Sequence, residues 1–289
     1  MRIGKLASIL LVCQLHLLGG TTLLGQAIPG STWKVEEPAY NALVARTYLI
    51  EVQPLVEKFT GWEIGGFPKF LLATREEYAK AAAPSMTKML RRKMPELTEA
   101  QALSLAQEAL RRTASGLLGR YDPLTKTIYL LPGNLRPIMQ AMNIHPRHTR
   151  DLVEVVVAHE MTHAVQDARH PISAVTDDAL SPEAFEAYAM MIEGHACHIQ
   201  EQVAKELKLD ESHALLIQRM NADNEKNIGA DGRGSWDRYL KGKAFIDAIF
   251  AQGGLPEVQK AFLNPPTSRR MVLDPTVYMN RQRLGSIGR

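Results

Sequence analysis

Two histidines and a glutamate stand at helical spacing in residues 159–163, which read His-Glu-Met-Thr-His. Residues four apart lie on nearly the same face of an α-helix, so His159 and His163 could direct both imidazoles at one metal ion. Glu160 lies about 100° further round the helix, where it could reach a water molecule at the metal without binding the metal itself. This H-E-x-x-H pattern predicts a zinc site, one ion per chain, with Glu160 as the general base.

The residues that precede the motif are strongly apolar. Val153 and the run 155–158 would bury the helix, and buried charged groups need partners. Zinc is the partner that this arrangement fits, and a helix is required because strand geometry would separate the two histidines. The alternative is a pair of core histidines beside a surface glutamate.

A catalytic zinc ion needs a third protein ligand. The class of enzymes with a third histidine, H-E-x-x-H-x-x-G-x-x-H, is excluded because the glycine position holds Gln166 and the third histidine position holds Arg169. The remaining possibility is a glutamate on a following helix, which is the gluzincin arrangement.

Three glutamates follow at suitable distances in the sequence: Glu183, Glu186 and Glu193. Glu193 is favoured because it interrupts an apolar stretch, and because Gly194 and Ala196 would let a neighbouring helix approach closely. Glu183 has the approximate spacing of thermolysin-like enzymes but lacks their N-E-x-x-S-D pattern. The predicted ligands are therefore His159, His163 and Glu193, with Glu186 and Glu183 as alternatives.

Peptide-bond hydrolysis is the chemistry that these residues support best. Zinc lowers the pKa of a water molecule bound to it, and Glu160 would take a proton as that water attacks a peptide carbonyl. A further group must stabilise the oxyanion, for which Tyr239 is preferred over His195, Tyr188 and Arg233. An endopeptidase is favoured over an aminopeptidase, because no amine-binding glutamate motif precedes the histidines.

Other groups must orient the two imidazoles. Zinc-bound histidines usually donate their second N–H to a carboxylate or a carbonyl. Thermolysin-like enzymes carry an aspartate one turn after the ligand glutamate, where this chain has Cys197. Asp167, Asp177 and Asp178 are the candidates to replace it, and Cys197 is expected to be a buried, inert thiol.

Two other functions are compatible with the motif. One is a catalytically inactive binding or scaffold protein with a zincin fold, although the intact Glu160 favours an active enzyme. The other is a zinc amidase that acts on a non-protein amide such as a cell-wall cross-link.

The first residues of the chain resemble an export signal. Arg2 and Lys5 precede an apolar run, residues 6–18, and 25–27 read Gly-Gln-Ala, which predicts cleavage after Ala27. The alternative is an uncleaved anchor, but the run is shorter than the ~20 residues that span a bilayer. We therefore expect a signal peptide at 1–27, a metallopeptidase domain at 28–289 without stable membrane insertion, and a periplasmic or extracellular location.

Composition limits the partners. The 289 residues carry a net charge of +3, and their lysines and arginines are spread along the chain, which argues against a nucleic-acid partner. The expected partner is a peptide or protein substrate, and the sequence makes no prediction of oligomeric state. Loss of Cys13 with the signal peptide would leave Cys197 alone, without an intrachain disulfide.

The element pattern predicts an α+β fold, with a mixed α and β first half followed by a mostly helical C-terminal half. Hydrophobic spacing and capping residues predict helices at 31–60, 98–114 (N-cap Thr98), 149–168, 182–207, 211–226, 236–252 and 256–263. A strand is expected at 67–74 and a hairpin at 119–132. Prolines at 265, 266 and 275 suggest an irregular tail.

Several segments together resemble a bacterial family of exported, largely uncharacterised gluzincin metallopeptidases. They are Ala-His-Glu-Met-Thr-His-Ala-Val-Gln-Asp at 158–167, Glu-Gly-His-Ala at 193–196, Tyr-x-x-Gly at 239–242, Asn-Pro-Pro-Thr-Ser at 264–268 and Val-Leu-Asp-Pro at 272–275. The resemblance covers residues 119–278 and implies a zincin-like (gluzincin) fold, with a small sheet packed on the H-E-x-x-H helix and a helical second lobe across a cleft. The chain departs from the family at Arg269, Arg270 and Asp274.

Overall fold

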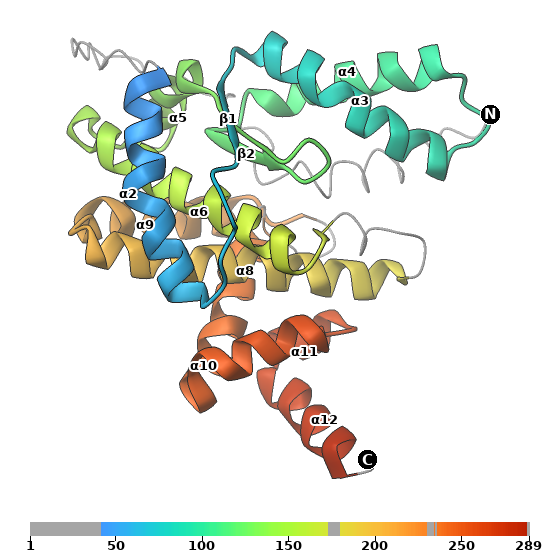
Figure 1. The fold of residues 1–289 in the computed structure, drawn as a ribbon, viewed down its shortest axis with the longest axis vertical. Helices are drawn as coiled ribbons and strands as arrows, with labels where there is room; N and C mark the ends of the chain where they lie inside the picture. Colours follow the sequence, from blue (N-terminus) through green and yellow to red (C-terminus); the bar gives the residue numbers. More distant parts are fainter. Residues whose placement is uncertain (1–41, 173–179, 230–233, 235, 288–289) are drawn as a thin grey trace. The chain divides into compact units, whose positions relative to one another are not determined.

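The computed structural model describes residues 42–172, 180–229, 234 and 236–287 (Figure 1). The chain forms two compact units, one of residues up to Ala45 with Lys69–Thr149, the other of Arg46–Pro68 with Arg150–Arg289. The predicted signal peptide lies outside the described residues. Among the helices that the structure describes, none combines the length and the apolar character that a membrane span requires.

The first unit contains a three-stranded sheet. Strands β1 (Lys69–Leu72), β2 (Gly119–Asp122) and β3 (Thr127–Leu130) lie in the order β1-β3-β2, with β1 parallel and β2 antiparallel to β3. The predicted strand and hairpin are confirmed. The Asp122 carboxylate closes the hairpin by accepting hydrogen bonds from the Leu124 N–H and the Thr125 hydroxyl, as turn aspartates do.

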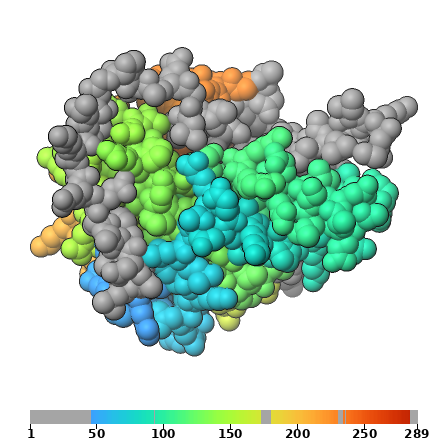
Figure 2. All heavy atoms as spheres, turned by 90° about the horizontal axis from the view of Figure 1, so that it is seen from above, coloured from blue at the N-terminus to red at the C-terminus, as the bar shows by residue number. Residues whose placement is uncertain are grey.

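Two helices form the hydrophobic core of this unit. Helices α3 (Arg75–Lys93) and α4 (Glu99–Ala114) each begin with a capping box, from Thr74 and Thr98 respectively, so the predicted N-cap is confirmed. They pack together through alanine-rich faces, which permit a close approach (Figure 1). Figure 2 shows the side chains of this pair, in teal and blue-green, as one continuous surface. Short helices η1 (Pro132–Asn134), α5 (Leu135–Ala141) and η2 (Pro146–His148) complete the unit.

The second unit is helical. Apart from the first residues of α2 (Ala42–Thr60), it contains α2, α6 (Thr149–Arg169), α8 (Pro182–Glu206), α9 (Asp210–Lys226), α10 (Asp237–Leu263), α11 (Arg269–Leu273) and α12 (Pro275–Ile287). The described helix bounds lie within one or two residues of those expected, except that the first part of the predicted helix at 31–60 lies outside the described residues. The small sheet and the many helices confirm the α+β class.

Helix α10 contains the break that the sequence predicts between two helices. Gly253 and Gly254 have non-helical dihedral angles, and the φ of +64° at Gly254 is one that glycine adopts without strain. The predicted irregular tail is wrong, because residues 269–287 form α11 and α12. Ser268 caps α11, and Pro275 is the first residue of α12, where proline's fixed φ and missing N–H suit a helix start.

Helices α8 and α10 cross at a pair of glycines. A Cβ atom added to Gly194 would lie 2.0 Å from the carbonyl carbon of Gly242, and one added to Gly242 would lie 2.0 Å from the carbonyl oxygen of Met190. The backbones are therefore in direct contact. This close approach of a neighbouring helix is what Gly194 and Ala196 predict from the sequence. The crossing lies next to Glu193 on α8 and one turn after Tyr239 on α10.

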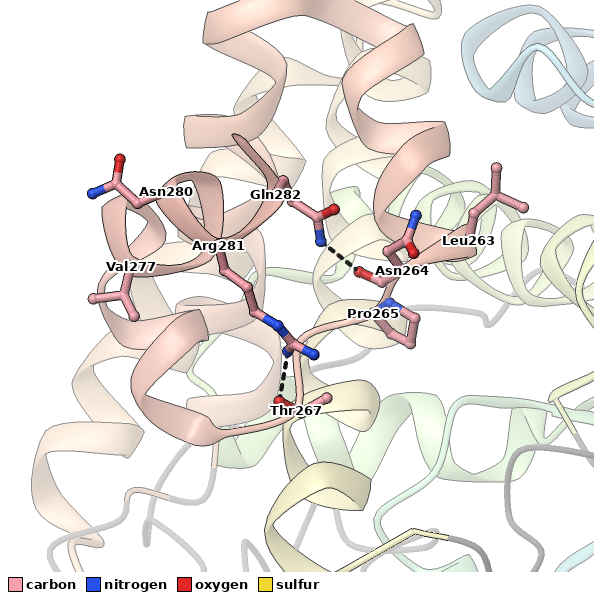
Figure 3. A pocket seen from close by; sticks show the side chains of 8 residues that line it. All are labelled: Leu263, Asn264, Pro265, Thr267, Val277, Asn280, Arg281 and Gln282. Atoms are coloured by element: carbon pink, nitrogen blue, oxygen red, sulfur yellow. Dashed lines mark hydrogen bonds between the residues drawn. The ribbon is translucent and has the colours of Figure 1, made fainter. Parts of the chain in front are cut away.

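An open pocket of about 850 Å³ lies between the C-terminal end of α10 and α12. In Figure 3, two hydrogen bonds join residues that line it, from Arg281 to the Thr267 hydroxyl and from Gln282 to the Asn264 carbonyl. The eight lining residues include no histidine, cysteine, aspartate or glutamate, so the pocket offers neither the usual metal ligands nor a carboxylate base.

Candidate metal centre

Helix α6 carries the H-E-x-x-H segment in its C-terminal half. The predicted helix is confirmed, and His159, Glu160 and His163 are all buried on it. The apolar residues Val153, Val155 and Val157 are at most 1% exposed, which anchors the helix in the core of its unit. Three ionisable side chains are thus held in an apolar setting, where each needs a charged or polar partner.

The imidazoles meet a carboxylate from α8. His159 Nε2 lies 3.1 Å from Glu193 Oε2, His163 Nε2 lies 3.2 Å from the same oxygen, and the two nitrogens are 3.1 Å apart. Ligands about 2.0–2.1 Å from a tetrahedral zinc ion lie roughly 3.3 Å from one another. The three atoms therefore form a nearly equilateral triangle of about the size that zinc requires, and this cluster could hold a metal ion.

The structure distinguishes among the three candidate glutamates. Glu186 is two turns before Glu193 on α8 and forms a buried ion pair with Arg238, with N–O distances of 2.5 and 3.1 Å. Glu183 is exposed in the first turn of α8. Glu193 is the glutamate that the fold brings to His159 and His163.

Two glutamines contact the imidazoles. His163 Nδ1 lies 2.8 Å from Gln166 Oε1, and His159 Nδ1 lies 3.0 Å from Gln200 Oε1. An amide oxygen accepts, so each Nδ1 carries a proton, and each ring in its neutral, metal-binding form would present an Nε2 lone pair to the triangle. Two lone pairs and a carboxylate oxygen then converge, an arrangement that a cation stabilises and that fits a metal.

The sequence-based candidates for this orienting role are placed elsewhere or not described. Asp167 accepts a hydrogen bond from the Ile172 N–H, while Asp177 and Asp178 lie outside the described residues. Cys197 is a buried free thiol, as expected, with Sγ 4.0 Å from His159 Nδ1. Gln166 could have been recognised as one turn beyond His163 on the same helical face, but Gln200 is 41 residues from His159.

The charges of the cluster are strongly coupled. Burial lowers the pKa of His163, but the Glu193 carboxylate outweighs burial and raises this pKa above its ordinary value. Burial in turn raises the pKa of Glu193, but His163 and His159 outweigh it and hold the carboxyl pKa well below its usual range. Burial also lowers the pKa of His159, but hydrogen bonds with Cys197 and Glu193 outweigh burial and raise this pKa to about 10, so the metal-free cluster holds a proton on imidazole at neutral pH.

We expect zinc binding to release this proton, because a ligand imidazole must be neutral. Since the pKa of His159 is raised to about 10, the apparent zinc affinity should increase with pH between 6 and 8, by about tenfold per pH unit for each proton released. Chelator competition at several pH values measures this dependence. An affinity that does not change across this range would contradict a protonated metal-free cluster.

Tyr239 lies beside one of the predicted ligands. Its ring centroid is 5.8 Å from that of His159, with the planes tilted by 31°, and it also contacts Trp236. His195 points toward Gln166, whose Nε2 lies 3.0 Å from His195 Nδ1, and burial lowers the pKa of His195 to about 3. Tyr188 is buried on α8, and Arg233 lies outside the described residues. Of the predicted oxyanion donors, Tyr239 has the ring contact with His159.

The start of α10, which carries Tyr239, is held by polar contacts. Asn224 accepts from the Trp236 N–H and donates to Asp237, and Arg269 donates to Asp237 at 2.5 Å. Arg269, one of the departures from the family pattern, thus braces the helix two residues before Tyr239. Asp274, another departure, accepts from the Thr276 N–H at the start of α12.

Comparison with known proteins identifies a shared fold and no family. No family model matches the chain, and no curated protein matches it. A solved structure from Chloroflexus aurantiacus, described as a "putative hydrolase with a novel fold", matches with a TM-score of 0.64 and 20% identity. The match covers 86% of this chain and 92% of that one. The chain shares that fold, and the zincin-like assignment stays a prediction.

Proposed function

We propose that this protein is a zinc-dependent metallopeptidase of the gluzincin type, with His159, His163 and Glu193 as metal ligands. The observation that carries the proposal is the triangle of two Nε2 atoms and one carboxylate oxygen, 3.1–3.2 Å on each side. Three protein ligands of the His-His-Glu type are the set found in catalytic zinc sites such as that of thermolysin, with the fourth position open for reaction.

Glu160 is the proposed general base. It precedes the second histidine on the same helix, is buried, and lies close enough to influence the charge of His163. Zinc in such a site supplies an activated water and polarises the substrate carbonyl. Glu160 accepts the proton released as water attacks and delivers it to the leaving amine.

Tyr239 is the proposed donor to the oxyanion. Its ring is beside His159, and the start of α10 is fixed by Asp237, Asn224 and Arg269, so the tyrosine needs little reorganisation. A preorganised hydroxyl donor stabilises the developing charge more effectively than water does.

Two other features agree with an exported hydrolase. The solved structure that shares the fold is described as a "putative hydrolase", which agrees with hydrolytic chemistry in general. Residues 1–27 have the charge and apolar pattern of a signal peptide, from which we propose export and a peptide or protein substrate.

Zinc content of the purified protein tests the metal site. We expect one zinc per chain in the wild type and in Glu183→Ala, which removes an exposed carboxylate from the same helix. Glu193→Ala should lose most of its zinc, because two histidines alone do not complete the ligand set. Glu186→Ala should retain zinc but unfold at a lower temperature, because the partly buried Arg238 would lose its partner.

The outcomes separate the possible functions. A folded wild-type protein that takes up no zinc when incubated with the metal would contradict a metallopeptidase and leave a binding protein with this fold. Stoichiometric zinc without cleavage of any member of a diverse peptide library would contradict peptidase activity. Zinc with cleavage would support the proposal.

A further inference from the structure

Two neutral side chains occupy the positions behind the proposed ligands. Gln166 on α6 contacts His163, and Gln200 on α8 contacts His159, each through its amide oxygen and the Nδ1 of the ring. Gln166 is fully buried and Gln200 is 5% exposed. A buried polar side chain needs hydrogen-bond partners. The imidazoles of His163 and His159 supply partners for the amide oxygens of these two glutamines.

The orientation of Gln166 is determined by three contacts. Its Nε2 donates to the Ile192 carbonyl at 3.0 Å and lies 3.0 Å from His195 Nδ1, while Oε1 lies 2.8 Å from His163 Nδ1. A flipped amide would direct its oxygen at the Ile192 carbonyl, where two acceptors would repel each other. Oε1 therefore accepts from His163 Nδ1–H, so Nε2 is the nitrogen that would face the metal once the ring is neutral.

Gln166 also connects the two ligand-bearing helices. Ile192 is the residue before Glu193 on α8, so one amide holds both the ring of His163 and the backbone beside the third ligand. Gln200 is seven residues beyond Glu193 on the same side of α8, and it reaches across to His159. Both contacts are made to rings whose Nε2 atoms belong to the triangle.

The chemistry of an amide differs from that of a carboxylate in this position. Either oxygen can accept the Nδ1 proton and so determine which nitrogen faces the metal. A carboxylate would add a negative charge and strengthen metal binding, whereas an amide imposes the same tautomer without changing the charge of the site.

We infer that Gln166 and Gln200 are positioning residues for the metal, which direct the Nε2 atoms of His163 and His159 at the oxygen of Glu193. This inference rests on the proposed metal site and adds the residues that set its geometry and its charge. Neither glutamine is expected to touch the substrate.

Paired substitutions at each glutamine test the inference, with zinc dissociation constants measured by chelator competition and Tm measured on the metal-free protein. Gln166→Met removes the acceptor for His163 and the donor to Ile192. Gln166→Glu keeps an acceptor for His163 but also loses the donor, so both variants should have a lower Tm. Gln166→Met should bind zinc about 10- to 100-fold more weakly than wild type, while Gln166→Glu should bind at least as tightly as wild type.

The same two substitutions at Gln200 should have the same effects. Gln200→Met should bind zinc more weakly than wild type, and Gln200→Glu should bind it at least as tightly. Thr162→Val is the matched control, because Thr162 is buried next to His163 and its hydroxyl donates to the Ala158 carbonyl of its own helix. Its zinc affinity should stay within about twofold of wild type, since no contact with an imidazole is lost.

A purely structural role would lower the Tm of the Met and Glu variants alike and would not separate their zinc affinities. If the wild-type protein binds zinc and both Met variants bind it with the same affinity, the inference would be overturned and the proposed function would remain intact. A wild-type protein that binds no zinc would overturn both.

Discussion

Glu160→Gln should lower the rate of peptide hydrolysis by about 10²- to 10⁴-fold while the protein retains one zinc per chain. Glutamine has nearly the shape of glutamate but cannot accept a proton from water, so the proposed proton transfer is lost. Since Glu160 supplies none of the three donor atoms of the triangle, the affinity for zinc should change little. Cleavage of a library peptide, followed by mass spectrometry, measures the rate.

Glu154→Gln is the matched control for this substitution. Glu154 is buried on the same helix, and its carboxylate accepts from Arg150 at 3.0 Å, a contact that a glutamine oxygen can keep. Its rate should remain close to wild type. A Glu160→Gln variant with wild-type activity would exclude Glu160 as the base, and equal losses in both variants would indicate a fold defect instead.

Gly242→Ala should destabilise the protein by about 3 kcal/mol or more, the upper end of the range for overpacking. The new Cβ would lie 2.0 Å from the Met190 carbonyl oxygen, and that oxygen belongs to a helix backbone, which cannot turn aside as a side chain can. Helices α8 and α10 would have to separate. For a chain of this size we expect Tm to fall by roughly 6–12 °C.

The separation should also weaken activity, because Tyr239 lies one turn before Gly242 and its ring contacts His159. Gly133→Ala is the control, since nothing lies within 4 Å of a Cβ at that position and its φ is not positive. Its Tm should change by less than that of Gly242→Ala. Thermal unfolding monitored by circular dichroism compares the two, and equal Tm values would contradict a backbone contact at the crossing.

The elements that depend on near neighbours were predictable from the residues alone. The spacing of His159 and His163 indicates a helix with both rings on one face, and helical geometry needs no distant contact to produce that. Thr98 predicts a helix start because its hydroxyl oxygen can accept a hydrogen bond from the backbone N–H three residues later. The tail prediction failed because Pro275 was interpreted as a helix breaker, although proline at the first helical position is favourable.

The groups that complete the site come from distant parts of the sequence. Three glutamates on α8 were possible ligands, and periodicity alone could not decide among them. The packing of α8 places Glu193 against the imidazoles, whereas the start of α10 pairs Arg238 with Glu186. Gln200 reaches His159 because α8 lies against α6, and Tyr239 reaches it from α10, which crosses α8 at Gly194 and Gly242.

The sequence by itself thus determined the motif helix, its two histidines and its glutamate, and the small-sheet, many-helix class, because short-range hydrogen bonding and side-chain periodicity dictate them. Tertiary structure decided which glutamate joins the histidines and which amides orient them. Those choices depend on how the helices pack against one another. The contacting residues are 30 to 41 positions apart in the sequence, and local periodicity does not encode such contacts.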